Sequence, residues 1–168
     1  MDLILVSACL AGINCRYDGK NSENEYVRSL VEAGRALPVC PEVLGGLPTP
    51  RVSCEIVVDA DGNNKVRSKD GRDFTGEFTA GAEKTLQIAR IIAATQAVLQ
   101  SRSPSCGYGY VYDGQFSGTF REGNGLTAEL LVQNGIKVIP VDDLPPAAPD
   151  EYKRPGAADP LWPGTKEQ

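Results

Sequence analysis

Short apolar segments that alternate with helical patterns constrain the fold more than any other feature of this sequence. The segment Leu3–Ala8 is apolar and partly β-branched, and a glycine-containing loop follows it, which predicts a buried strand. We expect three further short strands at Leu37–Val39, Gln96–Leu99 and Ile136–Val141. Pro140 indicates that the last strand ends early or lies at an edge. The order is broadly βαβ…αβ…αβ.

Three helices are expected between these strands. The first begins near Ser22–Glu25, which has capping-box spacing, and Gly34 supplies its end. The longest runs from about Glu77 to Ala93, because its apolar residues recur at helical spacing. A third covers Gly125–Asn134. We therefore predict a single-domain, Rossmann-like three-layer α/β fold with a mostly parallel central sheet.

Two segments depart from this alternation. In residues 55–67, the segments Glu55–Val58 and Lys65–Arg67 flank Asp61-Gly62-Asn63, the usual chemistry of a hairpin turn, and we expect a small β-hairpin outside the main sheet. Tyr108–Tyr112 is a further short extended segment. The chain then becomes rich in Pro, Ala and Gly, so the predicted domain covers residues 1–144 and residues 145–168 form an irregular tail.

Composition excludes several classes of function. The chain has no histidine, which excludes imidazole acid–base catalysis, a Ser-His-Asp triad and histidine-ligated metal sites. Its net charge of -5 argues against binding of long nucleic acid, because phosphate contacts need clustered lysine and arginine. The apolar N-terminal run is too short for a signal sequence or a membrane span, so we expect a cytoplasmic protein that acts on a small molecule.

Three cysteines follow predicted strands. Cys9 comes directly after the first strand, Cys40 after the second, and Cys106 a few residues beyond the third. Because ligands of open α/β sheets gather beyond the carboxyl ends of the strands, we expect these three side chains to converge. The chain has five cysteines, and in a reducing cytoplasm they are more often ligands, nucleophiles or core residues than disulfides.

The cysteine spacing leaves the metal undecided. Three thiolates without histidine suit zinc or an iron–sulfur cluster and would leave one coordination position open. Cys15 could reach the same rim as a fourth ligand, and a saturated metal would then be structural or electron-transferring. We favour three ligands, with Cys15 near the site. Cys54 precedes a strand of the hairpin, and we expect it to be structural or incidental.

Polar residues are dense around the three cysteines. Glu42 is the only carboxylate beside a predicted ligand on its strand end, and a partly dehydrated carboxylate can act as a general base toward water. The alternative is a helix cap or a solvated side chain. Serine hydroxyls near the cysteines could hold a substrate or relay a proton. Four loop cations could offset thiolate charge, although such residues are usually just solvated: Arg16, Lys20, Arg51 and Arg102.

Three motifs occur together around these cysteines. They are Val6-Ser7-Ala8-Cys9-Leu10 with Cys15-Arg16-Tyr17-Asp18-Gly19, Cys40-Pro41-Glu42-Val43-Leu44-Gly45-Gly46-Leu47-Pro48-Thr49-Pro50-Arg51, and Arg102-Ser103-Pro104-Ser105-Cys106-Gly107. In this combination the sequence closely resembles the TudS-like thiouracil desulfurase family. The resemblance extends to about Val141 and so covers nearly all of the predicted domain.

The resemblance implies a cofactor and a reaction. It implies a [4Fe-4S] cluster with three cysteine ligands and one open iron that takes sulfur from the substrate in a non-redox reaction. The ligands that it implies are Cys9, Cys40 and Cys106. The implied substrate is a thiolated pyrimidine such as 2- or 4-thiouracil, or the nucleoside, and the products are uracil and hydrosulfide.

The same resemblance implies roles for polar residues. Water activated by Glu42 would attack the ring carbon that carries the sulfur. Ser103 is expected to be the catalytic hydroxyl, and Ser7 and Ser105 are expected to bind the substrate in the pocket. Some relatives carry a further domain and act on thiolated transfer RNA, but this chain is too short and too acidic to include that module.

Two other functions compete with this interpretation. In the first, four cysteines saturate zinc or a cluster and the protein is a metal-binding module without catalysis, and Cys15 decides between that module and the enzyme. The second is a thiol redox protein, and the absence of a C-x-x-C motif counts against it. A homo-oligomer is compatible with the sequence, which leaves the oligomeric state open.

Overall fold

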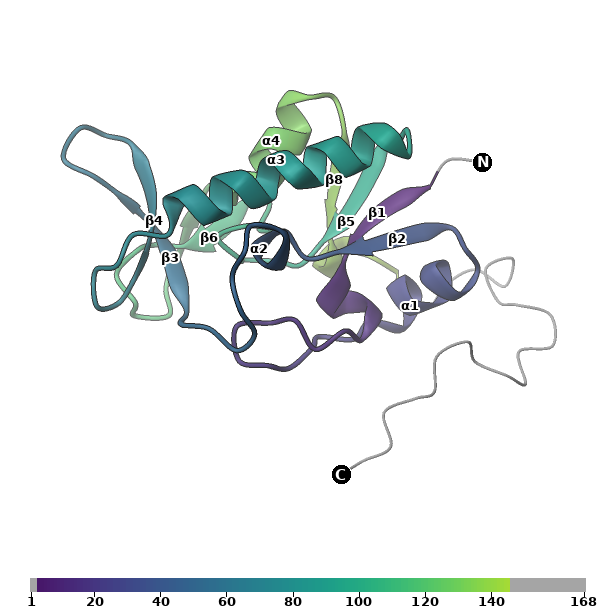
Figure 1. The fold of residues 1–168 in the computed structure, drawn as a ribbon, viewed down its shortest axis with the longest axis horizontal. Helices are drawn as coiled ribbons and strands as arrows, with labels where there is room; N and C mark the ends of the chain where they lie inside the picture. The colour runs from purple at the N-terminus through teal and green to yellow at the C-terminus, as the bar shows by residue number, and fades with distance from the viewer. Residues whose placement is uncertain (1–2, 146–168) are drawn as a thin grey trace.

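Four short parallel strands form the central sheet in the computed structural model, which describes residues 3–145 (Figure 1). In chain order they are β1 (Ile4–Ser7), β2 (Ala36–Val39), β5 (Gln96–Leu99) and β8 (Lys137–Pro140). Their spatial order is β2-β1-β5-β8, and Leu5 of β1 lies opposite Leu37 on one side and Ala97 on the other. The predicted parallel sheet is confirmed, and β8 with Pro140 lies at its edge.

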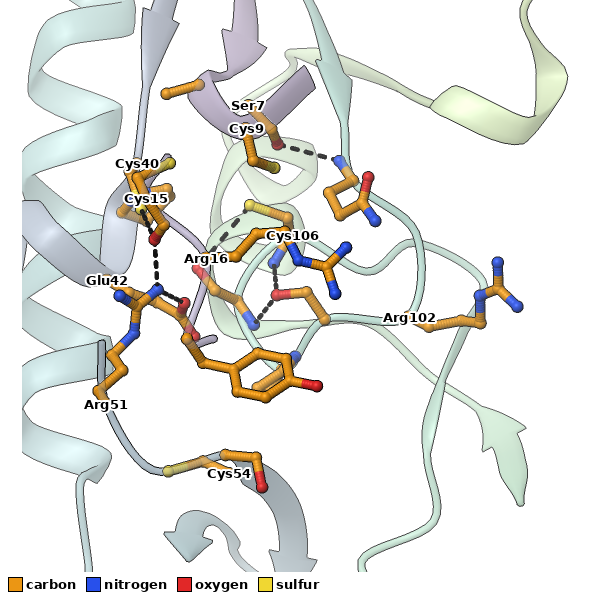
Figure 2. A pocket seen from close by; sticks show the side chains of 18 of the residues that line it. Ser7, Cys9, Cys15, Arg16, Cys40, Glu42, Arg51, Cys54, Arg102 and Cys106 are labelled. Carbon is orange, nitrogen blue, oxygen red and sulfur yellow. Dashed lines mark hydrogen bonds and ion pairs between the residues drawn. The ribbon is translucent and has the colours of Figure 1, made fainter. Parts of the chain in front are cut away.

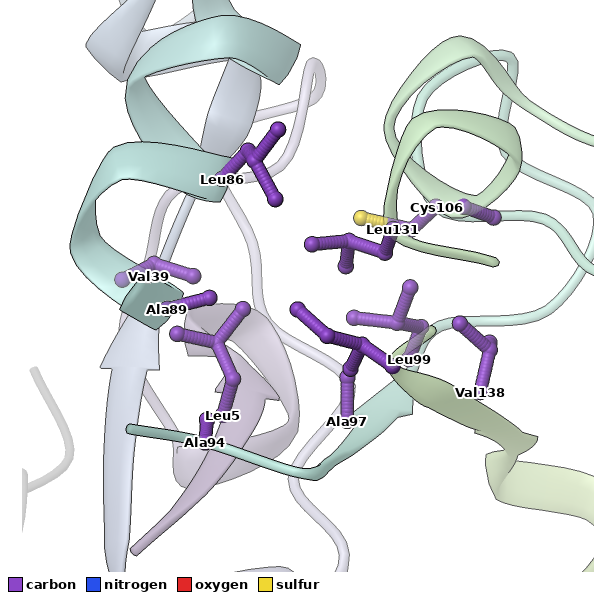
Figure 3. Close-up of a cluster of buried hydrophobic side chains, with 12 residues drawn as sticks. Leu5, Val39, Leu86, Ala89, Ala94, Ala97, Leu99, Cys106, Leu131 and Val138 are labelled. Carbon is purple, nitrogen blue, oxygen red and sulfur yellow. The ribbon is translucent and has the colours of Figure 1, made fainter. Parts of the chain in front are cut away.

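Helices cover both faces of the sheet and produce three layers (Figure 1). Helices α3 (Thr75–Ile91) and α4 (Leu126–Gln133) pack on one face, where Leu5 is fully shielded from solvent (Figure 3). Helix α1 (Glu25–Glu32) covers the other face and packs against Val6. Because neighbouring residues of a strand point to opposite faces, two adjacent apolar residues of β1 stabilise two different cores. The α/β fold expected from the sequence is confirmed.

The helices begin close to the predicted residues. The cap of α1 is Asn24 rather than Ser22, because the Asn24 side chain accepts a hydrogen bond from Val27 N at 3.2 Å. Helix α3 begins at Thr75, slightly before the expected start, and Thr75 N donates to a carboxylate oxygen of Asp73 at 2.8 Å. That bond satisfies one of the N–H groups that the first turn of a helix leaves without a partner.

Two antiparallel hairpins extend from this sheet. Strands β3 (Cys54–Val58) and β4 (Asn64–Ser68) form the hairpin expected from the sequence. Strands β6 (Tyr110–Tyr112) and β7 (Phe120–Glu122) form a second one, and β7 was not predicted. A small core of Ile56, Val66, Phe78 and Val111 joins the hairpins to α3.

Three short helical turns follow strands of the central sheet. They are the 3-10 helix η1 (Ala8–Ala11) after β1, the helix α2 (Pro41–Leu44) after β2 and the 3-10 helix η2 (Val141–Asp143) after β8. Helix α2 lies directly against α3, where Gly45 and Gly81 face each other's helices. A Cβ atom on Gly81 would stand 2.0 Å from the carbonyl oxygen of Pro41, so this close approach requires glycine.

The predicted tail of residues 145–168 lies, apart from Pro145, outside the described residues. Within residues 3–145, none of the helices combines the length and the apolar composition that crossing a bilayer needs.

Candidate active site

A cavity of about 450 Å³ opens where the parallel strands of the central sheet end (Figure 2). Cys9 lines it from η1, Cys40 from the junction of β2 and α2, and Cys106 from the loop after β5. The structure therefore brings the three cysteines together, as expected from their places after strands. The volume lies in the range of small-molecule sites.

Two further cysteines line the same cavity. Cys15 is 7% exposed, and its loop folds back so that Gly12 N and Ser22 N both donate hydrogen bonds to the carbonyl oxygen of Cys9. Cys15 lies beside Cys40, whose thiol donates to the Cys15 carbonyl at 3.8 Å. Figure 2 shows Cys54 apart from the other four, on the hairpin side of the cavity. The sequence did not predict that Cys54 would reach this cavity.

The thiols of Cys15, Cys40 and Cys106 have pKa values above the usual range of cysteine. The hydrogen bond with Cys15, followed by burial, raises the pKa of Cys40 above its usual range. For Cys15, the hydrogen bond with Cys40 lowers the pKa, but hydrogen bonding with Cys9 and burial outweigh it and raise the pKa to about 11. Burial raises the pKa of Cys106 to about 12. These thiolates need a nearby positive group to become stable.

Glu42 and Arg51 form a largely buried ion pair at one wall of the cavity (Figure 2). Glu42 lies in the first turn of α2, and its side chain is 17% exposed. The Arg51 side chain is only 5% exposed, and its Nη2 donates to Glu42 Oε2 and, at 2.9 Å, to the carbonyl oxygen of Cys15. Glu42 is therefore not a solvated surface carboxylate.

Of the serines expected at the site, Ser7 and Ser105 are buried and Ser103 is partly exposed. Ser7 Oγ accepts a hydrogen bond from Gln100 N at 2.9 Å. Ser103 Oγ accepts from the backbone N of both Ser105 and Cys106 at 3.1 Å, which fixes the turn that presents Cys106. Ser105 Oγ pairs with Thr127 Oγ1 at 3.1 Å. All three serines line the cavity.

Several cavity residues have no clear signal in the sequence. Gln100 Oε1 and Ser101 Oγ are buried without a hydrogen-bond partner among residues 3–145, and both residues line the cavity. Unpartnered buried polar atoms mark places where water or a ligand binds. Tyr17 and Tyr112 supply aromatic surface to the same cavity. Tyr17 lies within a cysteine motif and Gln100 shortly before another, and these positions are the signals that could have indicated the two residues.

The cysteine side chains of the cavity are of the kind that an iron–sulfur cluster uses. In the described part of the chain, no three Cys, Asp or Glu side chains meet closely enough to share one metal ion. The thiolates of an iron–sulfur cluster bind different irons, so they do not need to meet at one point. Soft sulfur donors without histidine are the ligands that such clusters use. Metal binding would also replace the protons that the raised thiol pKa values retain.

Comparisons with known proteins relate this chain to one family and to a solved structure. The model of a family described as 2-thiouracil desulfurase matches residues 4–143. The chain is 44% identical over 147 residues to the uncharacterized protein YbbK of Bacillus subtilis (strain 168), a match that covers 84% of this chain and 97% of YbbK. A solved structure of the [4Fe-4S]-dependent thiouracil desulfidase TudS is 41% identical, with a TM-score of 0.79 over 86% of this chain and 94% of that one.

Proposed function

This chain belongs to the 2-thiouracil desulfurase family, and we propose that it hydrolyses the carbon–sulfur bond of thiolated pyrimidines such as 2- or 4-thiouracil or the nucleoside. In this reaction a water oxygen bonds to the ring carbon, the carbon–sulfur bond breaks, and the sulfur leaves as hydrosulfide. No electrons are gained or lost. The observation that carries the proposal is the cavity that gathers Cys9, Cys40 and Cys106 beside the partly buried carboxylate of Glu42.

The proposed cofactor is a [4Fe-4S] cluster with three cysteine ligands and one open iron. Cys9, Cys40 and Cys106 would hold it, because they follow three different strands and reach one cavity. When bound, the cluster supplies a Lewis-acidic iron to the thiocarbonyl sulfur. Cys15 is buried beside Cys40 and would stay a thiol near the site rather than a fourth ligand.

Glu42 is the proposed general base. Its carboxylate lies on the cavity wall and can take a proton from the water that attacks the ring carbon. Ser103 is the proposed catalytic hydroxyl: its oxygen accepts two backbone N–H bonds, so its own proton is free to be donated to the substrate. We propose that Ser7 and Ser105 bind the substrate from the buried side of the cavity.

The proposed substrate is a small molecule. A cavity of about 450 Å³ suits a base or nucleoside, and a net charge of -5 disfavours long nucleic acid. We further propose a cytoplasmic location, since a reducing compartment keeps the thiols of the site available for iron. A homo-oligomer remains compatible with the proposal.

Anaerobic reconstitution with iron and sulfide tests this function. We expect a brown protein that converts 2-thiouracil or 4-thiouracil to uracil and hydrosulfide, measured by chromatography and sulfide release. Replacing Cys9, Cys40 or Cys106 with serine should abolish both the cluster absorbance and the activity. Cys15→Ser should keep the cluster, and Cys54→Ser serves as a control for cysteine removal inside the cavity.

Two outcomes would contradict the proposal. One is a colourless protein that contains zinc in stoichiometric amount. The other is a brown protein that leaves both thiouracils untouched at high enzyme concentration. Loss of the cluster in Cys15→Ser would instead favour the saturated metal-binding module.

A further inference from the structure

Arg51 is a buried cation whose position is set by the backbone around it. Its Nη1 donates to the carbonyl oxygen of Pro48 at 3.1 Å and to Thr49 Oγ1 at 3.3 Å. Its Nη2 donates to the carbonyl oxygen of Cys15 at 2.9 Å, and its own backbone N donates to the carbonyl of Tyr17 at 2.8 Å. Two loops therefore hold the guanidinium in place independently of the carboxylate that it contacts.

The guanidinium of Arg51 donates a hydrogen bond to one of the two carboxylate oxygens of Glu42. Nη2 contacts Oε2 of Glu42, and among residues 3–145 no hydrogen-bond donor contacts the other oxygen, Oε1. A carboxylate held at one oxygen by a fixed donor loses its freedom to rotate. The second oxygen is then the one that remains for a water molecule in the cavity.

Arg51 is suited to this task by its shape as well as its charge. A guanidinium is a planar fork with five N–H donors, so it can bind two carbonyl groups, a hydroxyl and a carboxylate at once. A lysine at this place would bring the charge but could not keep the same set of directions. The side chain is only 5% exposed, so bulk water competes little for its bonds to Glu42 and to the carbonyl of Cys15.

We propose that Arg51 is a positioning residue that fixes Glu42 by Oε2 and so leaves Oε1 to take the proton of the attacking water. This inference rests on the proposed role of Glu42 as general base. As the water oxygen bonds to the ring carbon, its proton passes to Oε1 and the carbon–sulfur bond breaks. Arg51 touches neither the substrate nor the water in this account and acts only through Glu42.

A purely structural role is the competing explanation. Arg51 also links the loop of Cys15 to the loop of Pro48, so its removal could simply loosen the cavity. The two roles differ in what they change. Loss of positioning lowers kcat while the cluster and the Michaelis constant remain, whereas loosening of the loops lowers cluster content and thermal stability together.

The test uses four variants of the reconstituted holoenzyme: Arg51→Met, Arg51→Lys, Glu42→Gln and the double variant Glu42→Gln with Arg51→Met. Arg72→Met is the control, because Arg72 pairs with Asp70 and its side chain is 58% exposed. Iron and sulfide content, thermal unfolding, kcat and KM for 2-thiouracil and 4-thiouracil are measured for each. A crystal structure of the metal-free Arg51→Met protein shows the direction of the Glu42 carboxylate without reference to activity.

We expect Arg51→Met to lower kcat by about 10- to 100-fold with KM changed by less than about threefold, and Arg51→Lys to recover part of the loss. The double variant should be little slower than Glu42→Gln alone, because Arg51 has no effect without the carboxylate. In the crystal structure of the metal-free Arg51→Met protein, the carboxylate of Glu42 should point in a different direction from that in the wild type. The control should match the wild type.

Three results would overturn the inference. They are an unchanged kcat in Arg51→Met, an unmoved Glu42 in its crystal structure, and loss of cluster and thermal stability in both Arg51→Met and Arg51→Lys, which would assign a structural role. A fully active Glu42→Gln would instead refute the general-base proposal, so the two failures are distinguishable.

Discussion

Individual residues of the site differ in how far sequence alone could predict them. The convergence of Cys9, Cys40 and Cys106 could be predicted, because a place shortly after a strand is a local property of the sequence. The burial of Arg51 was not, since it depends on carbonyl groups of Cys15 and Pro48 that only the folded chain brings together. Loop arginines are usually solvated, and nothing in the sequence marked this one as an exception.

The thiol of Cys54 provides a test at the same scale. Burial, followed by the charge of Glu42, raises the pKa of Cys54 to about 11. Because only the thiolate reacts with iodoacetamide, alkylation of Cys54 should still rise about tenfold per pH unit between pH 9 and pH 10. Peptide mapping by mass spectrometry measures the rate for Cys54 separately from the other cysteines.

An unstructured cysteine peptide is the reference for that measurement. Its rate should level off near pH 9, where most of its thiol is ionised. If the rate of Cys54 levelled off at the same pH as that of the peptide, Cys54 would be exposed to solvent and its pKa would not be raised.

At the scale of elements, helices and strands could be predicted where the pattern of apolar residues was long enough to show a period. Helix α3 and strand β5 were found with nearly correct bounds, because a repeated apolar stripe and a buried run carry the signal. Helix α2 has four residues and strand β7 has three, too few to show a period. Yet α2 carries Glu42, so one of the elements that sequence reasoning missed holds the proposed base.

The contact of α2 with α3 makes a prediction about Gly81. Replacing Gly81 with alanine would place a Cβ 2.0 Å from the carbonyl oxygen of Pro41, so α2 must move. We expect Gly81→Ala to destabilise the protein by about 1–3 kcal/mol and to reduce cluster incorporation, because α2 follows Cys40 directly. Urea unfolding and iron content measure the two effects.

Gly76 on the same helix is the matched control. A Cβ there would meet no atom within 4 Å. Gly76→Ala should therefore leave cluster content unchanged and change the free energy of unfolding by less than about 1 kcal/mol, in the stabilising direction. Equal stability of the two alanine variants would show that α2 can shift without cost.

For the whole molecule, the hairpins depend on each other as well as on the central sheet. Glu55 of β3 is 8% exposed, and its Oε2 accepts hydrogen bonds from the backbone N of Gly114 at 2.9 Å and of Phe116 at 3.0 Å. Both bonds use one oxygen. A single side chain thus ties the first hairpin to the turn between β6 and β7, which no local pattern in the sequence could indicate.

This link predicts a graded response at Glu55. Glu55→Ala leaves two backbone N–H groups without an acceptor and should lower the free energy of unfolding by about 1–3 kcal/mol. Glu55→Gln keeps a carbonyl oxygen at the same place and should lower the free energy of unfolding clearly less than Glu55→Ala does. Thermal and urea unfolding compare them with Glu83→Ala, which alters an exposed residue of α3. Equal losses in the alanine and glutamine variants would contradict the role of that oxygen.

The hydrogen bond from Gln100 N to Ser7 Oγ joins positions separated by 93 residues, at the junction of the two central strands. Two of the proposed ligands, Cys9 and Cys106, come from the same two distant parts of the chain. A nascent polypeptide that has only its first half outside the ribosome therefore holds two of the three sulfurs and cannot complete the site. Iron uptake would then report that synthesis and tertiary folding are finished, and the brown colour of a preparation would measure its correctly folded fraction.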